Sequence, residues 1–127
     1  MTEADLTGTS FDEVNLSRTK LDKVQFTSAE IDDMNFVGMS LISSKWDESE
    51  VDGSQFNKAA MRQASFYNTQ ISKSTFMNTD LVKSVFQQAF IEKSEFQKAQ
   101  LKGSNFNSAN VLKVIFVKAD LSRSSML

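Results

Sequence analysis

Apolar residues recur at every fifth position of this chain, without a break from residue 6 to residue 126. Because only 40% of the residues are hydrophobic, such a series of 25 positions would arise by chance with a probability of about 10⁻¹⁰. The chain therefore consists of five-residue repeats, and a strict repeat over a whole chain is typical of a solenoid. The series is Leu6, Phe11, Leu16, Leu21, Phe26, Ile31, Phe36, Leu41, Trp46, Val51, Phe56, Met61, Phe66, Ile71, Phe76, Leu81, Phe86, Ile91, Phe96, Leu101, Phe106, Val111, Phe116, Leu121 and Met126.

A period of five predicts a corner in every repeat. In an unbroken strand, residues five apart point to opposite faces, and in an α-helix they lie about 500° apart, so neither element collects the series on one side. Two positions before each large apolar residue, from Ala4 to Ser124, stands an Ala, Ser, Thr, Val or Met. Residues two apart in a strand point the same way, so each repeat sends one small and one large side chain inward.

The corner residues agree with this interpretation. All four glycines, and also Asn68 and Asn78, stand two positions after a large apolar residue, where a corner needs a positive φ or close backbone approach. Proline, which would remove a hydrogen-bond donor from a ladder, is absent.

Between Phe26 and Phe116 the large residue alternates between aromatic and aliphatic. If like residues stack, each coil holds an even number of repeats, and four sides of five residues give a 20-residue coil. At about 4.8 Å between strands, about six coils form a rod on the order of 30 Å long. The expected columns are Phe26, Trp46, Phe66, Phe86 and Phe106; Phe36, Phe56, Phe76, Phe96 and Phe116; Ile31, Val51, Ile71, Ile91 and Val111; and Leu41, Met61, Leu81 and Leu101.

These repeats resemble the pentapeptide-repeat family, whose pattern is A(D/N)Lxx. Ala4-Asp5-Leu6, Ala109-Asn110-Val111 and Ala119-Asp120-Leu121 follow that pattern, and Ser74-Thr75-Phe76 and Ser94-Glu95-Phe96 show a Ser-x-Phe variant. The resemblance covers residues 1–127 and implies one domain, an all-β, right-handed quadrilateral parallel β-helix. The family motif carries packing and no chemistry, so the resemblance implies no catalytic residue.

Composition narrows the function. Cysteine and histidine are absent, which removes the usual nucleophiles, general bases and zinc ligands. We therefore expect no enzyme, no catalytic residue, no cofactor and no metal site, and no loop in the sequence suits a calcium ion. The chain starts without a leader-like segment and holds no apolar run long enough to span a bilayer, so we expect a cytoplasmic protein that does not bind membranes.

Charge is divided along the chain. Residues 1–60 carry a net charge of −7 and residues 61–127 carry +5, although the whole chain carries only −2. A 20-residue coil stacks several carboxylates into an acidic column on one corner. The candidate column comprises Asp12, Glu13, Glu30, Asp32, Asp33, Glu50 and Asp52.

The acidic column has two interpretations. The resemblance implies a DNA mimic, because members of the quinolone-resistance type protect DNA gyrase and mimicry by an acidic rod is the explanation given for them. The column spans only about three coils, about 14 Å, against about 34 Å for one turn of duplex DNA. Above it stand Lys73, Lys93 and Lys113, of the opposite sign. The other interpretation is a solvated face.

Two further surfaces are candidates for protein contacts. Tyr67 and Phe90 are the aromatic residues outside the inward register, so we expect an exposed aromatic patch near Val82 and Val85. The last full coil has outward apolar residues and the chain stops soon afterwards, which favours a homodimer through the C-terminal coil; relatives in the family dimerise through their C-terminal ends. The candidate dimer interface is Leu112, Ile115, Val117, Met126 and Leu127.

The sequence thus favours a non-enzymatic protein-binding or scaffold module with a partner of unknown identity. Its alternative is a DNA-mimic regulator or protector of a DNA-binding enzyme such as DNA gyrase. Direct binding of nucleic acid is not expected, because the basic half lacks rows of stacking aromatic residues. A piece of a larger effector or multidomain protein is a third possibility that the sequence leaves open.

Overall fold

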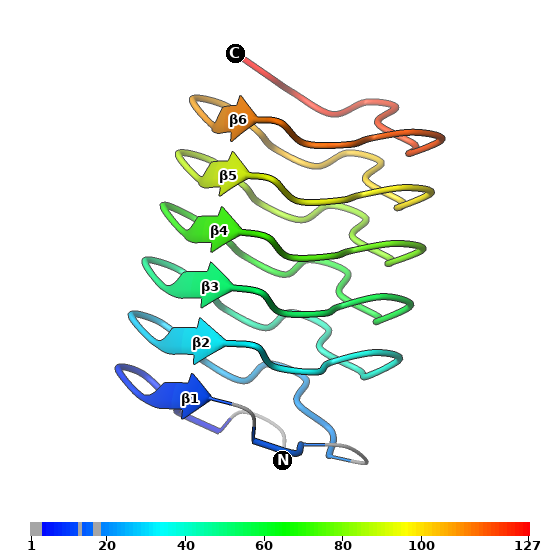
Figure 1. The fold of residues 1–127 in the computed structure, drawn as a ribbon. Helices are drawn as coiled ribbons and strands as arrows, with labels where there is room; N and C mark the ends of the chain where they lie inside the picture. Colours follow the sequence, from blue (N-terminus) through cyan, green and yellow to red (C-terminus); the bar gives the residue numbers. More distant parts are fainter. Residues whose placement is uncertain (1–3, 13, 17–18) are drawn as a thin grey trace.

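The computed structural model describes residues 4–12, 14–16 and 19–127, and these residues form a β-solenoid (Figure 1). Six three-residue strands lie in one parallel sheet in the order β1-β2-β3-β4-β5-β6. No helix is present among the described residues. The strands are β1 (Ser10–Asp12), β2 (Glu30–Asp32), β3 (Glu50–Asp52), β4 (Gln70–Ser72), β5 (Phe90–Glu92) and β6 (Asn110–Leu112).

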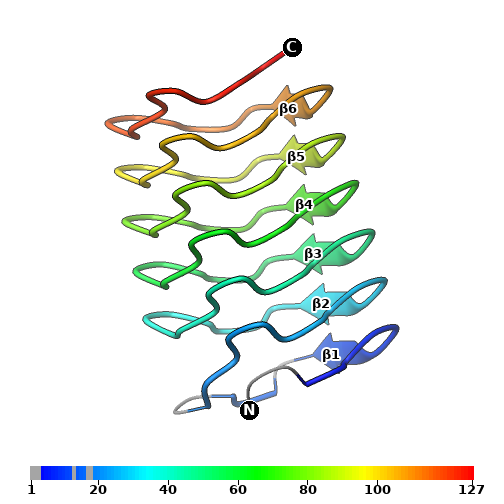
Figure 2. The same ribbon diagram turned by 180° about the vertical axis from the view of Figure 1, so that it is seen from behind.

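The coil has the predicted length of 20 residues. Phe11 pairs with Ile31, and Ile31 pairs with Val51, so each strand lies in register with the strand of the next coil. Isolated parallel bridges with the same spacing, such as Asn35 with Gln55, tie the other sides together. In Figure 1 the strands lie on the near side and run from left to right as the chain climbs, and Figure 2 shows the other side of the coils. The solenoid is therefore right-handed, as the resemblance implied.

Two aromatic columns form the centre of the core. Phe56 and Phe76 stack with ring centroids 4.7 Å apart and an interplanar angle of 4°, and Phe76 and Phe96 are 4.6 Å apart at 4°. The other column includes Phe66 and Phe86 at 5.0 Å. Rings of the two columns meet edge to face, as Phe66 and Phe76 do at 85°. Both arrangements suit the ring quadrupole, and the predicted columns are confirmed.

The burial of the inward residues decreases at both ends of the rod, although the series of apolar positions continues there. Large inward residues from Leu21 to Phe106 are buried, whereas those of the first and last coils, such as Leu16 and Leu121, are half-buried. Met126, the last position of the apolar series, is 55% exposed because no described coil lies over it.

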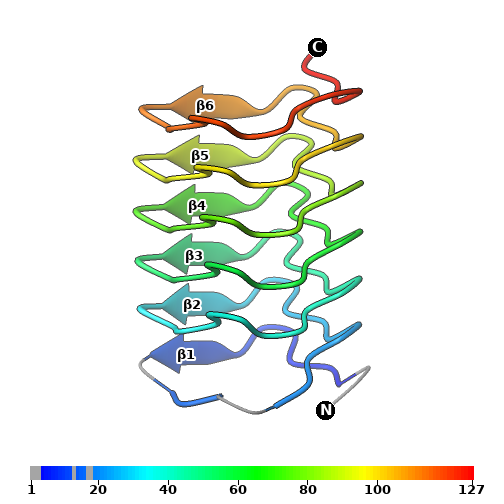
Figure 3. The same ribbon diagram turned by 90° about the vertical axis from the view of Figure 1, so that its right-hand side faces the viewer.

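Every described corner residue from Gly8 to Arg123 has a positive φ. The sequence pointed to the glycines and two asparagines, but the 16 other described corner positions also have a positive φ, and most of them carry Lys, Ser or Gln. The stacking of coils therefore imposes the left-handed conformation on residues that do not favour it. Figure 3 shows the corners aligned one above another along the rod.

Corners differ in how the backbone turn is closed. At three of the four, the N–H of the small inward residue donates to the carbonyl of the preceding large one, as Ala29 does to Phe26 at 3.0 Å. At the corner that follows each strand, hydroxyls replace this turn bond: the N–H of Met34, Ser54 and Ser74 donates to Oγ of the serine one coil higher, each at 3.1 Å. Buried serines thus hold the coils together where the turn is open.

Candidate binding surfaces

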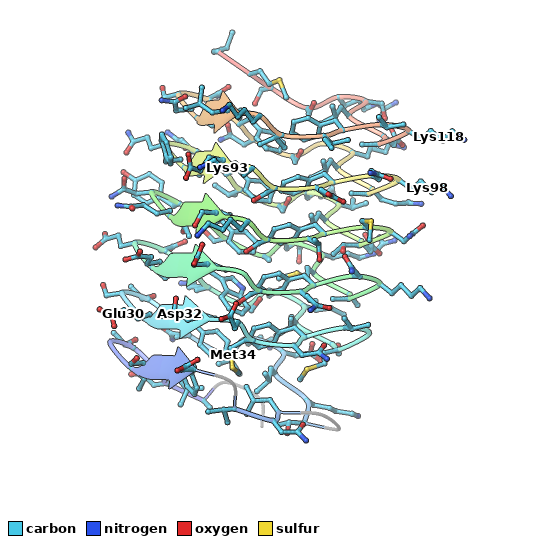
Figure 4. All side chains as sticks on the ribbon, in the orientation of Figure 1. Glu30, Asp32, Met34, Lys93, Lys98 and Lys118 are labelled. Carbon is cyan, nitrogen blue, oxygen red and sulfur yellow. The ribbon has the colours of Figure 1, made fainter. Side chains whose placement is uncertain are left out.

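The acidic column forms as predicted on the side of the parallel sheet. Asp12, Asp32 and Asp52 stand in register in β1, β2 and β3, and Glu30 and Glu50 pair on the same strands. Asp33 occupies the corner after β2, whereas Glu13 lies outside the described residues. Figure 4 shows Glu30 and Asp32 at the two ends of β2.

The members of the column have different electrostatic environments. Partial burial raises the pKa of Asp32, and the charges of Asp52, Asp12, Glu30 and Asp33 raise it further. By contrast, the hydroxyl of Ser72 donates to Asp52 at 2.5 Å and lowers the pKa of that carboxyl, and Lys73 adds to the effect. The column is therefore repulsive at its centre and neutralised at its upper end.

The column changes sign above β3. Lys73 Nζ lies 3.4 Å from Asp52 Oδ1, and the corners above it hold Lys93 and Lys113. Lys93 Nζ lies 3.7 Å from the carboxylate of Glu92, the last residue of β5. One vertical edge of the rod therefore carries carboxylates in its lower half, and three lysines together with the carboxylate of Glu92 in its upper half.

A second lysine column lies at the next corner, where Lys98 and Lys118 stand one coil apart (Figure 4). The side between the two lysine columns carries Met77 in one coil and Ile115 and Val117 in the last full coil. The linear sequence does not mark this arrangement, because these residues come together only when the coils stack.

The predicted aromatic patch is exposed but divided by a corner. Tyr67 lies on the side that precedes the corner residue Asn68, whereas Phe90 begins β5 directly above Gln70. Both side chains are 36% exposed, and the corner at Asn68 lies between their two sides of the rod. Val82 and Val85 are half-buried. The two aromatic residues thus present separate contact points.

An open groove of about 510 Å³ lies at this corner, and Phe90 forms part of its wall. No sequence signal marked it, since its polar residues look like ordinary surface positions until the coils stack. The other residues that line it are all polar or charged: Glu48, Ser49, Glu50, Asn68, Thr69, Gln70 and Gln88. A larger groove of about 780 Å³ lies near the first coil, between Val14 and Val37.

The C-terminal coil exposes the apolar side chains that the sequence predicted. Leu112 and Ile115 are exposed, Val117 is 59% exposed and Leu127 is 92% exposed. In the coil below, the equivalents of Leu112, Ile115 and Val117 are Glu92, Glu95 and Gln97. We call Leu112, Ile115 and Val117 the apolar rim.

Among the described residues, no group of three or more acidic side chains is arranged to hold a metal ion. Likewise, the described part of the chain contains no helix that is long and apolar enough to cross a membrane.

Family models match nearly the whole solenoid. Residues 50–126 match a model described as a pentapeptide repeat region, which alone covers more than half of the chain, and residues 1–36 match a model described as pentapeptide repeats. The chain belongs to the pentapeptide-repeat family. The resemblance seen in the sequence is therefore confirmed. A search of curated proteins gave no match.

Solved structures of pentapeptide-repeat proteins share this fold. A protein from the thylakoid lumen of Arabidopsis thaliana is 20% identical, with a TM-score of 0.62 over 80% of this chain and 64% of its own. HetL, involved in the regulation of heterocyst differentiation in Nostoc sp. strain PCC 7120, is 17% identical, with a TM-score of 0.55 over 98% and 66%. Rfr23 from Cyanothece 51142 is 12% identical, with a TM-score of 0.53 over 99% and 86%.

This pentapeptide-repeat chain thus spans about two thirds of the length of the first two structures. At these identities the likeness shows the fold alone.

Proposed function

We propose that this pentapeptide-repeat chain is a non-enzymatic protein-binding module that binds through the apolar rim of its last full coil. The proposal rests on one observation about three neighbouring columns. Leu112, Ile115 and Val117 are aliphatic, whereas the equivalent residues in the coil below are charged or carry an amide. A solenoid side that only faces water gains nothing from three exposed aliphatic residues in one patch, and such patches are typical of protein contacts.

The partner that fits this rim is a second copy of the chain. A two-fold contact between two rims places aliphatic side chains against aliphatic side chains and closes the assembly at a dimer. Met126 and Leu127, exposed at the same end, enlarge the apolar area.

Light scattering tests this contact. We expect the wild type to have the mass of a dimer at micromolar concentration, and the variant Ile115→Glu with Leu127→Glu to have that of a monomer, because each change buries a charge in the apolar contact. Gln55→Glu with Gln87→Glu is the matched control, since it adds the same charges to the same two columns in lower coils. A monomeric wild type, or a double variant that stays dimeric, would overturn the proposal.

The alternative function is DNA mimicry by the acidic column. Its support is the register of Asp12, Asp32 and Asp52, which places carboxylates at the spacing of adjacent strands. Against it stands the ion pair between Asp52 and Lys73, where the run of acidic residues in consecutive coils stops after three coils. Protein binding through the apolar rim is therefore the better-supported proposal.

A further inference from the structure

We propose that one side of the coils that begin with β3 to β6 binds an acidic, extended segment of a partner protein. This side begins at the corner of Lys98 and Lys118, which project outward in Figure 4, and ends at the corner of Lys83 and Arg123. We call it the basic side. Its exposed cations are Lys58, Lys83, Lys98, Lys102, Lys118 and Arg123.

Backbone ladders hold the basic side in register from coil to coil. Asp80 pairs in parallel with Ala60 in the coil below and with Gln100 in the coil above. At the corner, the N–H of Lys83 donates to the carbonyl of Lys102 in the next coil at 2.9 Å. The cations are therefore attached to a rigid backbone that repeats about every 4.8 Å.

Two carboxylates lie among these cations, and both already have partners. Asp80 Oδ2 lies 2.5 Å from Nε of Arg62, which also belongs to this side. Asp120 accepts the backbone N–H of Ser122 at 2.9 Å, and hydrogen bonds from Ser122 and the charge of Lys102 lower the pKa of Asp120. Among the described residues, none of the six exposed cations forms an ion pair. The basic side thus keeps a net charge of +5.

The distribution of charge around the rod argues for a binding role. Six of the nine basic residues after residue 60, Arg62 included, lie on the basic side, and the other three are the lysines of the corner after the strands. In the same coils, the side with Tyr67 and Gln87 and the corner with Asn68 and Gln88 carry no charged side chain. Charges that served only solubility would be interspersed over all sides.

The partner that fits this side is a run of acidic residues. A net charge of +5 over four coils, about 19 Å, is one charge per about 4 Å, close to the rise of about 3.4 Å per residue in an extended segment. Duplex DNA carries one negative charge per about 1.7 Å, so less than half of its charge would be neutralised.

The residue types also favour an acidic segment over nucleic acid. Five of the six exposed cations are lysines, which lack the planar fork that binds phosphate in a bidentate manner. The outward positions of the basic side hold no aromatic residue on which a base could stack.

Fluorescence anisotropy with three labelled probes tests the choice of partner. The probes are a peptide of about eight glutamates, a peptide of about eight glutamines and a DNA duplex of about 20 base pairs. We expect the glutamate peptide to bind, and its Kd to rise at least about ten-fold between about 50 mM and about 200 mM salt, because exposed ion pairs are screened. The glutamine peptide should not bind, and the duplex should bind at least about five-fold more weakly than the glutamate peptide.

Charge reversal tests the location. Lys98→Glu with Lys102→Glu should weaken binding of the glutamate peptide at least about ten-fold. Lys73→Glu with Lys93→Glu is the matched control, since it makes the same change of charge at the corner after the strands and should weaken binding less than about three-fold. Glutamate is compatible with a corner, because Glu48 has a φ of 59°. Equal weakening by both double variants, equal binding of the two peptides, or tighter binding of the duplex would overturn the inference.

This contact goes beyond the proposed function and is measured separately from it. The basic side contains none of the residues of the apolar rim, so Lys98→Glu with Lys102→Glu should keep the mass of the wild type in light scattering. A dimeric wild type that does not bind the glutamate peptide rejects only the basic side as a binding surface. A monomeric wild type that binds it rejects only the dimer through the apolar rim.

Discussion

The hydroxyl of Ser74 accepts the backbone N–H of Ser54, one coil below, at 3.1 Å. Both residues are buried, and Ser74 Oγ also donates to the carbonyl of Ser72 at 2.9 Å. Ser84 occupies the same inward position two repeats after Ser74 and is equally buried, but its Oγ has no hydrogen-bond partner. Serines that look identical in the repeat pattern therefore have different roles.

This difference predicts opposite effects of one substitution. Ser74→Ala should lower the free energy of unfolding by about 1–3 kcal/mol, because it leaves the buried N–H of Ser54 without an acceptor. Ser84→Ala should change it by less than about 0.5 kcal/mol or raise it, because an unpartnered hydroxyl is removed. Chemical denaturation of both variants measures the difference, and equal losses would contradict the prediction.

Removal of one ring from the aromatic column should be costly. Phe76 stacks on Phe56 and Phe96 and meets Phe66 edge to face. We expect Phe76→Ala to lower the free energy of unfolding by about 3–5 kcal/mol, because coils pinned by backbone ladders cannot collapse into the cavity. Lys98→Ala, at an exposed corner, is the control. A loss below about 1 kcal/mol in equilibrium denaturation would count against the rigidity of the column.

Two corner glycines should respond differently to alanine. Gly38 has a φ of 69° and open space at its Cβ position, so Gly38→Ala should cost about 1 kcal/mol for the left-handed conformation alone. A Cβ at Gly53 would clash with Asp33 Oδ1, so Gly53→Ala should cost about 0.5–1.5 kcal/mol more as Asp33 leaves its rotamer. Adding Asp33→Ala to Gly53→Ala should abolish the excess in thermal or chemical denaturation.

Asp32 and Asp52 of the acidic column should affect the free energy of unfolding with opposite signs as the pH changes. The fold raises the pKa of Asp32, so its ionised form destabilises the folded chain above that pKa and the penalty disappears as the pH falls. Asp32→Asn should therefore raise the free energy of unfolding at about pH 7, with a gain that shrinks towards about pH 4.

The fold lowers the pKa of Asp52, so this group contributes stability that is complete above its unfolded value and is lost as the pH falls below it. Asp52→Asn should accordingly be less stable than the wild type at about pH 7 and at about pH 5. Urea titrations of the two variants at several pH values would decide, and a parallel response of both variants would show that the column does not control their ionisation.

The DNA-mimic alternative makes a functional prediction of its own. If the acidic column engaged a type II topoisomerase, changing Asp12, Asp32 and Asp52 together to Asn should abolish the effect without unfolding the rod. We expect the wild type itself to have no effect in a supercoiling or protection assay, because the run of acidic residues in consecutive coils stops at the Asp52–Lys73 pair. Inhibition by the wild type that the triple variant loses would reverse this conclusion.

By itself the sequence determined most of the fold. A period of five with alternating aromatic and aliphatic residues sets the direction of every side chain, the 20-residue coil and the four columns, since only that stacking puts Phe76 on Phe56 and Ile71 on Val51. The exposed acidic column, the aromatic residues and the apolar rim followed from the same register. These features depend on position within the repeat, which the sequence states directly.

The tertiary structure decided which contacts each residue makes with the neighbouring coils. Hydroxyl partners separate Ser74 from Ser84, a carboxylate lies over Gly53, and Lys73 reaches back to Asp52. Corner residues such as Lys93 take a positive φ because the ladders on both sides hold them there. Each of these facts depends on the rotamers and backbone of residues about 20 positions away, and the periodic pattern specifies the direction of a side chain but not the contact it makes.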